Sequence, residues 1–172
     1  MQSGMNEVYT KPMTTDVLAR IKNTYFAVNN DCTTATQQIN TLGPDLPQTE
    51  DELFKLADFT VFDAQSALTG MGRDINLLKN ILVSIIEKET PSDLAALHQA
   101  HSRGDWHMVE QLAHRMKSGF VYCGAEKLVH ACQYLERYHK AGHTRVLERL
   151  YQQLLVVIDE TNQQVNEWLR RK

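Results

Sequence analysis

The chain has 172 residues, of which 42% are hydrophobic, and a formal net charge of −3. This composition supports one hydrophobic core, with room for a second, partial unit. The slightly acidic balance and the lack of a basic run argue against general affinity for nucleic acid or an anionic membrane surface. No apolar run approaches the ~20 residues that cross a bilayer, and the N-terminus lacks the pattern of a signal peptide. We therefore expect a cytoplasmic chain without direct membrane contact, whose parent protein can be anchored in the inner membrane.

The first predicted unit covers residues 1–29. Its letters EVYT predict a short strand, Lys11-Pro12 ends that strand, and an amphipathic helix follows. One strand and one helix cannot form a domain alone. Residues 30–48 are polar, contain Gly43-Pro44 and Pro47, and show no hydrophobic period. We therefore expect a linker over residues 30–48.

The third predicted unit, residues 49–172, is helical almost throughout. Thr49 and Glu52 have the spacing of a capping box at its start. Long helices are then expected over residues 74–89, 91–104, 105–123, 125–141 and 144–170. The break at Thr90-Pro91 is expected because proline suits the first position of a helix and Asp93 lies three residues after Thr90. Short loops favour antiparallel neighbours, which predicts an all-α, up-and-down four-helix bundle with extra N-terminal helices.

The helix expected to begin after Asp105 carries the residues with the clearest chemistry. At about 100° per residue its apolar residues form one stripe, which must face the core. The stripe consists of Val109, Leu112, Ala113, Met116, Phe120 and Cys123. His114 lies roughly 150° from the centre of that stripe, so it should be exposed. Lys117, Ser118 and Val121 lie on the same side as His114, and Gly119 lies beside them.

These residue types suit a histidine that accepts a phosphoryl group. An imidazole is partly neutral at pH 7 and is then a nucleophile. A nearby ammonium group can screen an anion attached to the ring, and small residues let another protein come close. A glycine in the middle of a helix costs about 1 kcal/mol relative to alanine, so Gly119 should have a compensating use.

At these positions the sequence resembles histidine-phosphotransfer (HPt) domains. The pattern of that family is matched without a gap by His114, Met116, Lys117, Ser118-Gly119, Gly124-Ala125, Leu128, Cys132 and Leu135-Glu136. The resemblance covers about residues 59–169. It departs from the family pattern at Ser118, where glycine is common, although serine is also small.

The resemblance implies a phosphorelay intermediate of two-component signal transduction, with receiver domains of a parent kinase and of a response regulator as its partners. His114 would accept a phosphoryl group through Nε2 from a receiver aspartate and pass it to the aspartate of a response regulator. Lys117 would offset the charge of that group, and Glu136 would accept a hydrogen bond from Nδ1–H of the histidine. The expected partner-binding residues are Gln111, Ser118, Gly119 and Val121. The domain would need no cofactor of its own, because the Mg²⁺ for the transfer would lie in the receiver.

The first unit resembles the last strand and helix of a receiver domain over about residues 3–28. In that family the lysine of the pair matched by Lys11-Pro12 contacts the phosphorylated aspartate. That aspartate and the acidic metal-binding residues would lie upstream of this sequence, so the unit would not be an active receiver. The resemblance implies the C-terminal part of a hybrid sensor histidine kinase, with receiver, linker and HPt domain in that order.

The remaining histidines and cysteines are assigned no chemistry. His98 and His101 lie one turn apart, but no third ligand has matching spacing, so no metal site is predicted. The three cysteines form no CxxC motif, and we expect them to be reduced.

Two other functions are considered. A structural or scaffolding bundle would carry no labile phosphate. An autophosphorylating dimerisation domain of a histidine kinase usually has an acid directly after its histidine and a proline a few residues on. Here Arg115 follows His114, no proline follows Pro91, and no Gly-rich ATP-binding domain follows. We therefore expect a phosphocarrier without ATP-dependent activity of its own.

Overall fold

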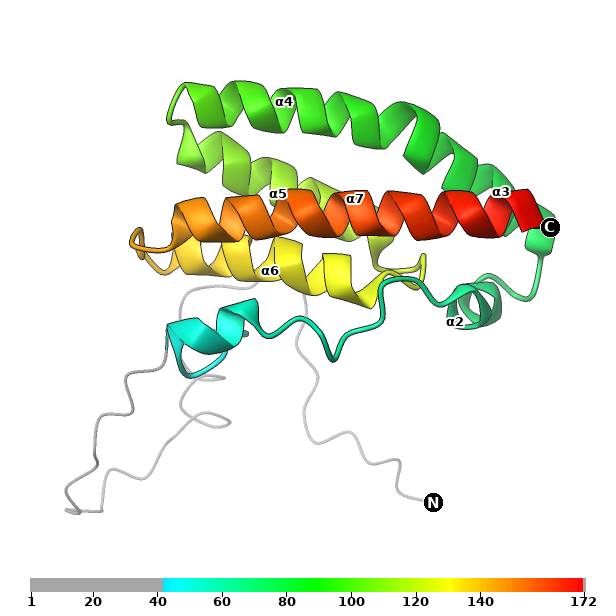
Figure 1. Ribbon diagram of the computed structural model, residues 1–172, viewed down its shortest axis with the longest axis horizontal. Coiled ribbons are helices and arrows are strands. Elements are labelled where there is room, and N and C mark those ends of the chain that lie inside the picture. Colours follow the sequence, from blue (N-terminus) through cyan, green and yellow to red (C-terminus); the bar gives the residue numbers. More distant parts are fainter. Residues whose placement is uncertain (1–41, 172) are drawn as a thin grey trace, which may run out of the picture. The chain divides into compact units, whose positions relative to one another are not determined.

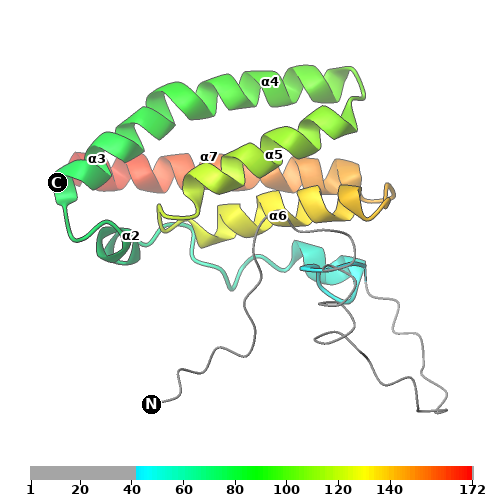
Figure 2. The same ribbon diagram turned by 180° about the vertical axis from the view of Figure 1, so that it is seen from behind.

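The computed structural model describes residues 42–171, of which residues 75–171 form an antiparallel bundle (Figure 1). Its first long helix consists of α3 (Ile75–Ser84), the π-helical turn η2 (Ile85–Glu89) and α4 (Thr90–Ser102). The other three are α5 (Trp106–Phe120), α6 (Glu126–Lys140) and α7 (Leu147–Arg171). Seen from behind, α5 lies between α4 and α6 (Figure 2). The described residues contain no strand, and the predicted all-α four-helix bundle is confirmed.

Each long helix buries an apolar stripe in one shared core. The largest hydrophobic side chains that are completely buried are Tyr138, Tyr151, Leu53, Leu78, Leu82, Leu97, Leu128, Leu135, Leu150, Leu154 and Ile158. Burying an aliphatic side chain of this size contributes roughly 1.5–3 kcal/mol relative to leaving it in water. Packing of these stripes, rather than helix propensity, therefore holds the bundle together.

The predicted break at Thr90-Pro91 is wrong, because the chain stays helical through these residues. Thr90 has φ −61° and ψ −44°, and its N–H donates to the carbonyl of Ile85, five residues earlier. A proline inside a regular α-helix lacks one hydrogen bond and its ring meets the carbonyl four residues back. In the structure a wider π turn lies directly before Pro91. This turn gives the proline ring room and shifts the hydrogen-bond pattern at the position where proline has no N–H to donate. The Thr90 side chain is buried and has no hydrogen-bond partner, so it caps nothing.

Several predicted helix ends agree with the structure. The Asp105 side chain caps α5 by accepting a 2.9 Å hydrogen bond from the Met108 N–H. Helix α6 ends two residues before Gly142, which has φ +82°. The Thr49 N–H donates to the Glu52 carboxylate at 3.1 Å, as a capping box requires, and this opens the short 3₁₀ helix η1 (Glu50–Phe54). Caps of this kind can be predicted from the sequence, because the residues that form them lie within a few positions of each other.

The segment ahead of the bundle is attached to α6 and α7. The Tyr138 hydroxyl donates to Glu50 at 2.6 Å, and the Gln153 amide donates to the carbonyl of Leu53 at 3.0 Å. Residues 42–48, which fall in the predicted linker, also reach the bundle, since Arg137 lies 3.4 Å from Asp45. The predicted strand, the first predicted helix and linker residues 30–41 lie outside the described residues.

A second contact holds the turn between α5 and α6. The Asp63 N–H donates to the carbonyl of Gly124 at 2.8 Å, and the Lys127 N–H donates to the carbonyl of Thr60 at 2.9 Å. The short helix α2 (Ala64–Gly70) starts directly after this contact. Residues 60–63 therefore supply a hydrogen-bond acceptor to the first turn of α6, whose N–H groups have no partner inside the helix.

Replacing Gly124 by alanine should destabilise the domain by about 3 kcal/mol, because strain and a steric clash add. Gly124 has φ +70°, and a Cβ there would lie 2.2 Å from the carbonyl oxygen of Asp63. Gly104 is a matched control, since it has φ +68° and open space around its missing Cβ. Gly104→Ala should therefore cost only about 1 kcal/mol in urea unfolding. Equal losses in the two variants would contradict the close approach of Asp63.

Candidate functional site

Helix α5 places its apolar stripe in the core and His114 on the surface. Residues Val109, Leu112, Ala113, Met116 and Phe120 are all buried. The His114 side chain is 55% exposed. The orientation predicted from helical periodicity is therefore confirmed for this helix.

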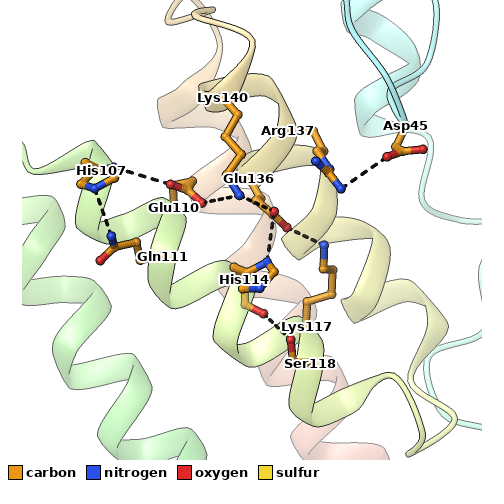
Figure 3. Close-up of polar contacts among 10 residues, drawn as sticks. All are labelled: Asp45, His107, Glu110, Gln111, His114, Lys117, Ser118, Glu136, Arg137 and Lys140. Atoms are coloured by element: carbon orange, nitrogen blue, oxygen red, sulfur yellow. Dashed lines mark hydrogen bonds and ion pairs between the residues drawn. The ribbon is translucent and has the colours of Figure 1, made fainter. Parts of the chain in front are cut away.

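A buried carboxylate lies behind the exposed imidazole. Glu136 comes from α6 and is only 1% exposed, and its Oε1 lies 3.1 Å from Nδ1 of His114 (Figure 3). Helical spacing alone places Glu136 at the margin of the apolar stripe of α6. In the structure it faces α5, so one ring nitrogen of His114 contacts the protein interior.

Two ammonium groups share the carboxylate of Glu136. Nζ of Lys117 lies 2.5 Å from Oε2, and Nζ of Lys140 lies 2.8 Å from Oε1. Lys117 was expected on the exposed face beside His114, but its side chain is 16% exposed because it turns back onto Glu136. A buried carboxylate is stable only when it is paired in this way, since an isolated buried charge costs several kcal/mol.

Sequence reasoning missed two members of this charge cluster. Glu110 on α5 is 4% exposed, and its Oε1 lies 3.1 Å from Nζ of Lys140. Its Oε2 lies 3.6 Å from Nδ1 of His107. A signal was present in the sequence, because Glu110 precedes His114 by one helical turn and Lys140 follows Glu136 by one turn. Two carboxylates and two ammonium groups thus join α5 to α6.

The charges around Glu136 hold it ionised. Burial would raise the pKa of this carboxyl group, but hydrogen bonds from Lys117 and Lys140 and the contact with His114 lower it from 4.5 to about 2. The pKa of Lys140 is raised by its hydrogen bonds to Glu136 and Glu110. Ionised carboxylates accept hydrogen bonds only, so the Nδ1 of His114 that faces Glu136 is favoured as a protonated donor.

The low pKa of Glu136 predicts how stability depends on pH. A carboxyl group with a lowered pKa in the folded state stabilises the protein above its unfolded pKa, and that contribution is lost as pH falls from about 4.5 through about 2. We expect Glu136 to contribute on the order of 2 kcal/mol less at pH 3 than at pH 5. The measurement is urea unfolding of the protein and of Glu136→Gln at both pH values. An equal loss in the two proteins would assign the pH dependence to other carboxylates.

The predicted partner-binding residues all lie at the surface near His114. Gln111, Ser118, Gly119 and Val121 are exposed, and Val121 is 50% exposed. The Ser118 hydroxyl donates to the carbonyl of His114 at 3.0 Å, and the Gln111 amide lies 3.0 Å from Nε2 of His107. Apart from its chain neighbours and the backbone of its own helix, no atom of residues 42–171 lies within 4 Å of a Cβ built on Gly119, so this part of α5 is open.

Tyr122 was not predicted as part of this surface. It is 72% exposed and follows Val121 directly. The signal that was available is its place next to Val121 in the turn after α5. The two side chains are exposed side by side in sequence, directly after the C-terminal end of α5.

Two of the other histidines in the described residues have polar partners inside the bundle. His98 contacts the Tyr151 hydroxyl at 2.8 Å, and His101 contacts Glu148 at 2.7 Å. Among residues 42–171 no group of three His, Cys, Asp or Glu side chains is placed to hold a metal ion. In that same range, no helix combines the length and apolar character that crossing a membrane requires.

Comparisons with known proteins identify the bundle. Residues 81–168, slightly more than half of the chain, match the family model of the Hpt domain. The virulence sensor protein BvgS of Bordetella pertussis (strain Tohama I) is 25% identical over 172 residues. That alignment covers 99% of this chain but 13% of BvgS, so the chain spans a small part of this relative. No solved structure matched the chain.

The matched residues extend from the end of α3 to near the end of α7, and so include most of the four-helix bundle. Family membership implies receiver domains as partners in two-component relays. The chain belongs to the Hpt domain family and acts as a histidine-phosphotransfer intermediate of a phosphorelay.

Proposed function

We propose that His114 is the residue that carries the phosphoryl group. The observation that supports this most directly is the exposed imidazole whose Nδ1 lies 3.1 Å from the buried carboxylate of Glu136. A hydrogen bond from Nδ1–H to Glu136 fixes the tautomer and leaves the lone pair on Nε2, as the acid of a catalytic triad does for its histidine.

The chemistry at Nε2 follows from this arrangement. The lone pair of Nε2 forms a bond to phosphorus while the bond from phosphorus to the receiver's aspartate breaks, and the aspartate leaves as a carboxylate. No proton leaves the ring, so the phosphorylated imidazole keeps Nδ1–H and becomes positively charged. The ionised Glu136 stabilises that positive charge, and Lys117 offsets part of the charge on the phosphoryl oxygens.

The partners are proposed to be a receiver of the parent kinase and a receiver of a response regulator. Gln111, Ser118, Gly119 and Val121 are proposed to meet the partner, because they are exposed on the helix that carries His114 or directly after it. The Mg²⁺ needed for transfer is assigned to the receiver's acidic pocket, and docking in the cytoplasm supplies the in-line geometry.

We also propose that the chain is part of a hybrid sensor histidine kinase. Its proposed parts are a receiver remnant over residues 1–29, a linker over 30–48 and the Hpt bundle over 49–172. The alignment with BvgS supports this proposal, because it covers 99% of the chain and only 13% of that sensor protein.

The test is to incubate the chain with a phosphorylated receiver and Mg²⁺, and separately with ATP and Mg²⁺. We expect an acid-labile phosphoryl group from the receiver only, which mass spectrometry under neutral conditions locates on His114. Label from ATP alone would favour an autophosphorylating dimerisation domain. No label from several receivers, or label on another residue, would contradict the assignment of His114.

A further inference from the structure

The carboxylate of Glu136 has more cationic partners than its charge requires. Lys117 lies 2.5 Å from Oε2, whereas Lys140 and His114 share Oε1 at 2.8 and 3.1 Å. One lysine would be enough to balance one carboxylate. The charge of the second lysine is balanced by Glu110, 3.1 Å from Lys140, yet Lys140 also lies 2.8 Å from Glu136.

The two lysines differ in where they can act. Lys117 is on α5, one turn after His114, so its ammonium group can reach either Glu136 or a group bound to the imidazole. Lys140 is on α6, four residues after Glu136, and it is bound between two buried carboxylates (Figure 3). The network is neutral before phosphorylation, since two ammonium groups face two carboxylates.

A phosphoryl group on Nε2 would change this balance, because it places negatively charged oxygens outside a ring that has itself become positively charged. Lys117 is the lysine closest in sequence to His114 and can pair with the phosphoryl oxygens. If it left Glu136 and no other cation remained there, the buried carboxylate would be an unpaired charge. Removing one partner of a buried ion pair typically costs about 3–5 kcal/mol. Lys117 can therefore move only if another cation stays on Glu136.

We propose that Lys140 is a positioning residue for phosphoryl transfer, because it keeps Glu136 neutralised while Lys117 turns from that carboxylate to the phosphoryl group. The inference rests on the proposed role of His114. Glu110 holds Lys140 in place from the opposite side, so the α6 lysine remains beside Oε1 when Lys117 has left. Glu136 then stays ionised and continues to hold Nδ1–H of the phosphorylated ring.

The test compares single-turnover transfer from a phosphorylated receiver in three variants. Lys140→Met should lower the rate at saturating receiver about 10-fold, with the half-saturating receiver concentration unchanged within about 2-fold. Lys140→Arg keeps a cation and should recover most of the rate. The matched control is Lys127→Met, which removes another lysine of α6 from a 2.6 Å ion pair with Glu160, and it should stay within about 2-fold of wild type.

A second measurement does not depend on any variant. After phosphorylation by phosphoramidate, NMR signals of the lysine ammonium groups should shift for Lys117 and stay nearly constant for Lys140. A folded Lys140→Met protein with the wild-type rate, or a Lys117 signal that does not respond to phosphorylation, would overturn the inference. In either case the proposed function stands if His114 is still labelled, and it fails separately if the wild-type chain takes up no phosphoryl group at His114.

Discussion

Replacing His114 by glutamine should reduce phosphoryl uptake from a phosphorylated receiver to background, at least about 100-fold below wild type. The amide of glutamine has no nucleophilic lone pair comparable to that of imidazole. The fold should be retained, because the His114 side chain is 55% exposed and Glu136 keeps both lysine partners. Surface changes of this kind alter stability by about 0.5 kcal/mol at most. The measurement is acid-labile label per protein, with circular dichroism as the check on folding.

His107→Gln is the matched control for this experiment. His107 is on the same helix, its side chain is 72% exposed, and its Nδ1 lies 3.6 Å from the buried Glu110. It therefore shares exposure and a neighbouring acid with His114, but the family pattern does not include it. The control should accept the phosphoryl group at the wild-type level. Uptake that survives in His114→Gln and disappears in His107→Gln would move the phosphorylated position by two turns.

Replacing Glu136 should produce the second large effect, on both transfer and stability. Glu136→Ala removes the acceptor for Nδ1–H and leaves Lys117 and Lys140 without their shared buried carboxylate. We expect transfer to slow about 100-fold, and the free energy of unfolding to fall by about 3 kcal/mol. Transfer is measured in a single turnover with a phosphorylated receiver, and stability in urea at pH 7.

Glu136→Gln separates the hydrogen bond from the charge. The amide oxygen can still accept from Nδ1–H, but it cannot balance the positive charge of the phosphorylated ring. The rate should therefore lie between those of wild type and Glu136→Ala, roughly 10-fold below wild type. A Glu136→Ala protein that transfers as fast as wild type would show that the contact at 3.1 Å has no part in the chemistry.

The parts of the fold that could be predicted from the sequence depend on short-range patterns. The buried stripe of α5 and the exposure of His114 follow from a period of 3.6 residues, which any amphipathic helix must obey. The cap at Asp105 and the helix end before Gly142 also involve neighbours in sequence. The helix start predicted at Pro91 is wrong, because a proline often occupies the first position of a helix and no short-range sequence pattern indicates a π turn.

The charge cluster could be predicted only in part, because it depends on which helices face each other. The family resemblance predicts Glu136 as part of the site, whereas its angular position on α6 does not show that it faces His114. Glu110 and Lys140 were missed, since a charged residue on a helix is normally solvated and nothing in one helix shows that another carries its counterion. Pairing between α5 and α6 is tertiary information.

The contact between Nδ1 of His114 and Glu136 also affects how a partner protein binds and reacts. Because Glu136 is buried and bound by two lysines, its carboxylate has a fixed position, and its contact with Nδ1 holds the ring of His114 in one orientation. Immobilising a free side chain on association costs about 0.5–1.5 kcal/mol, and here most of that ordering occurs when the helices assemble. Nε2 of His114 is therefore oriented toward solvent before a receiver binds, so even a short-lived complex can lead to reaction.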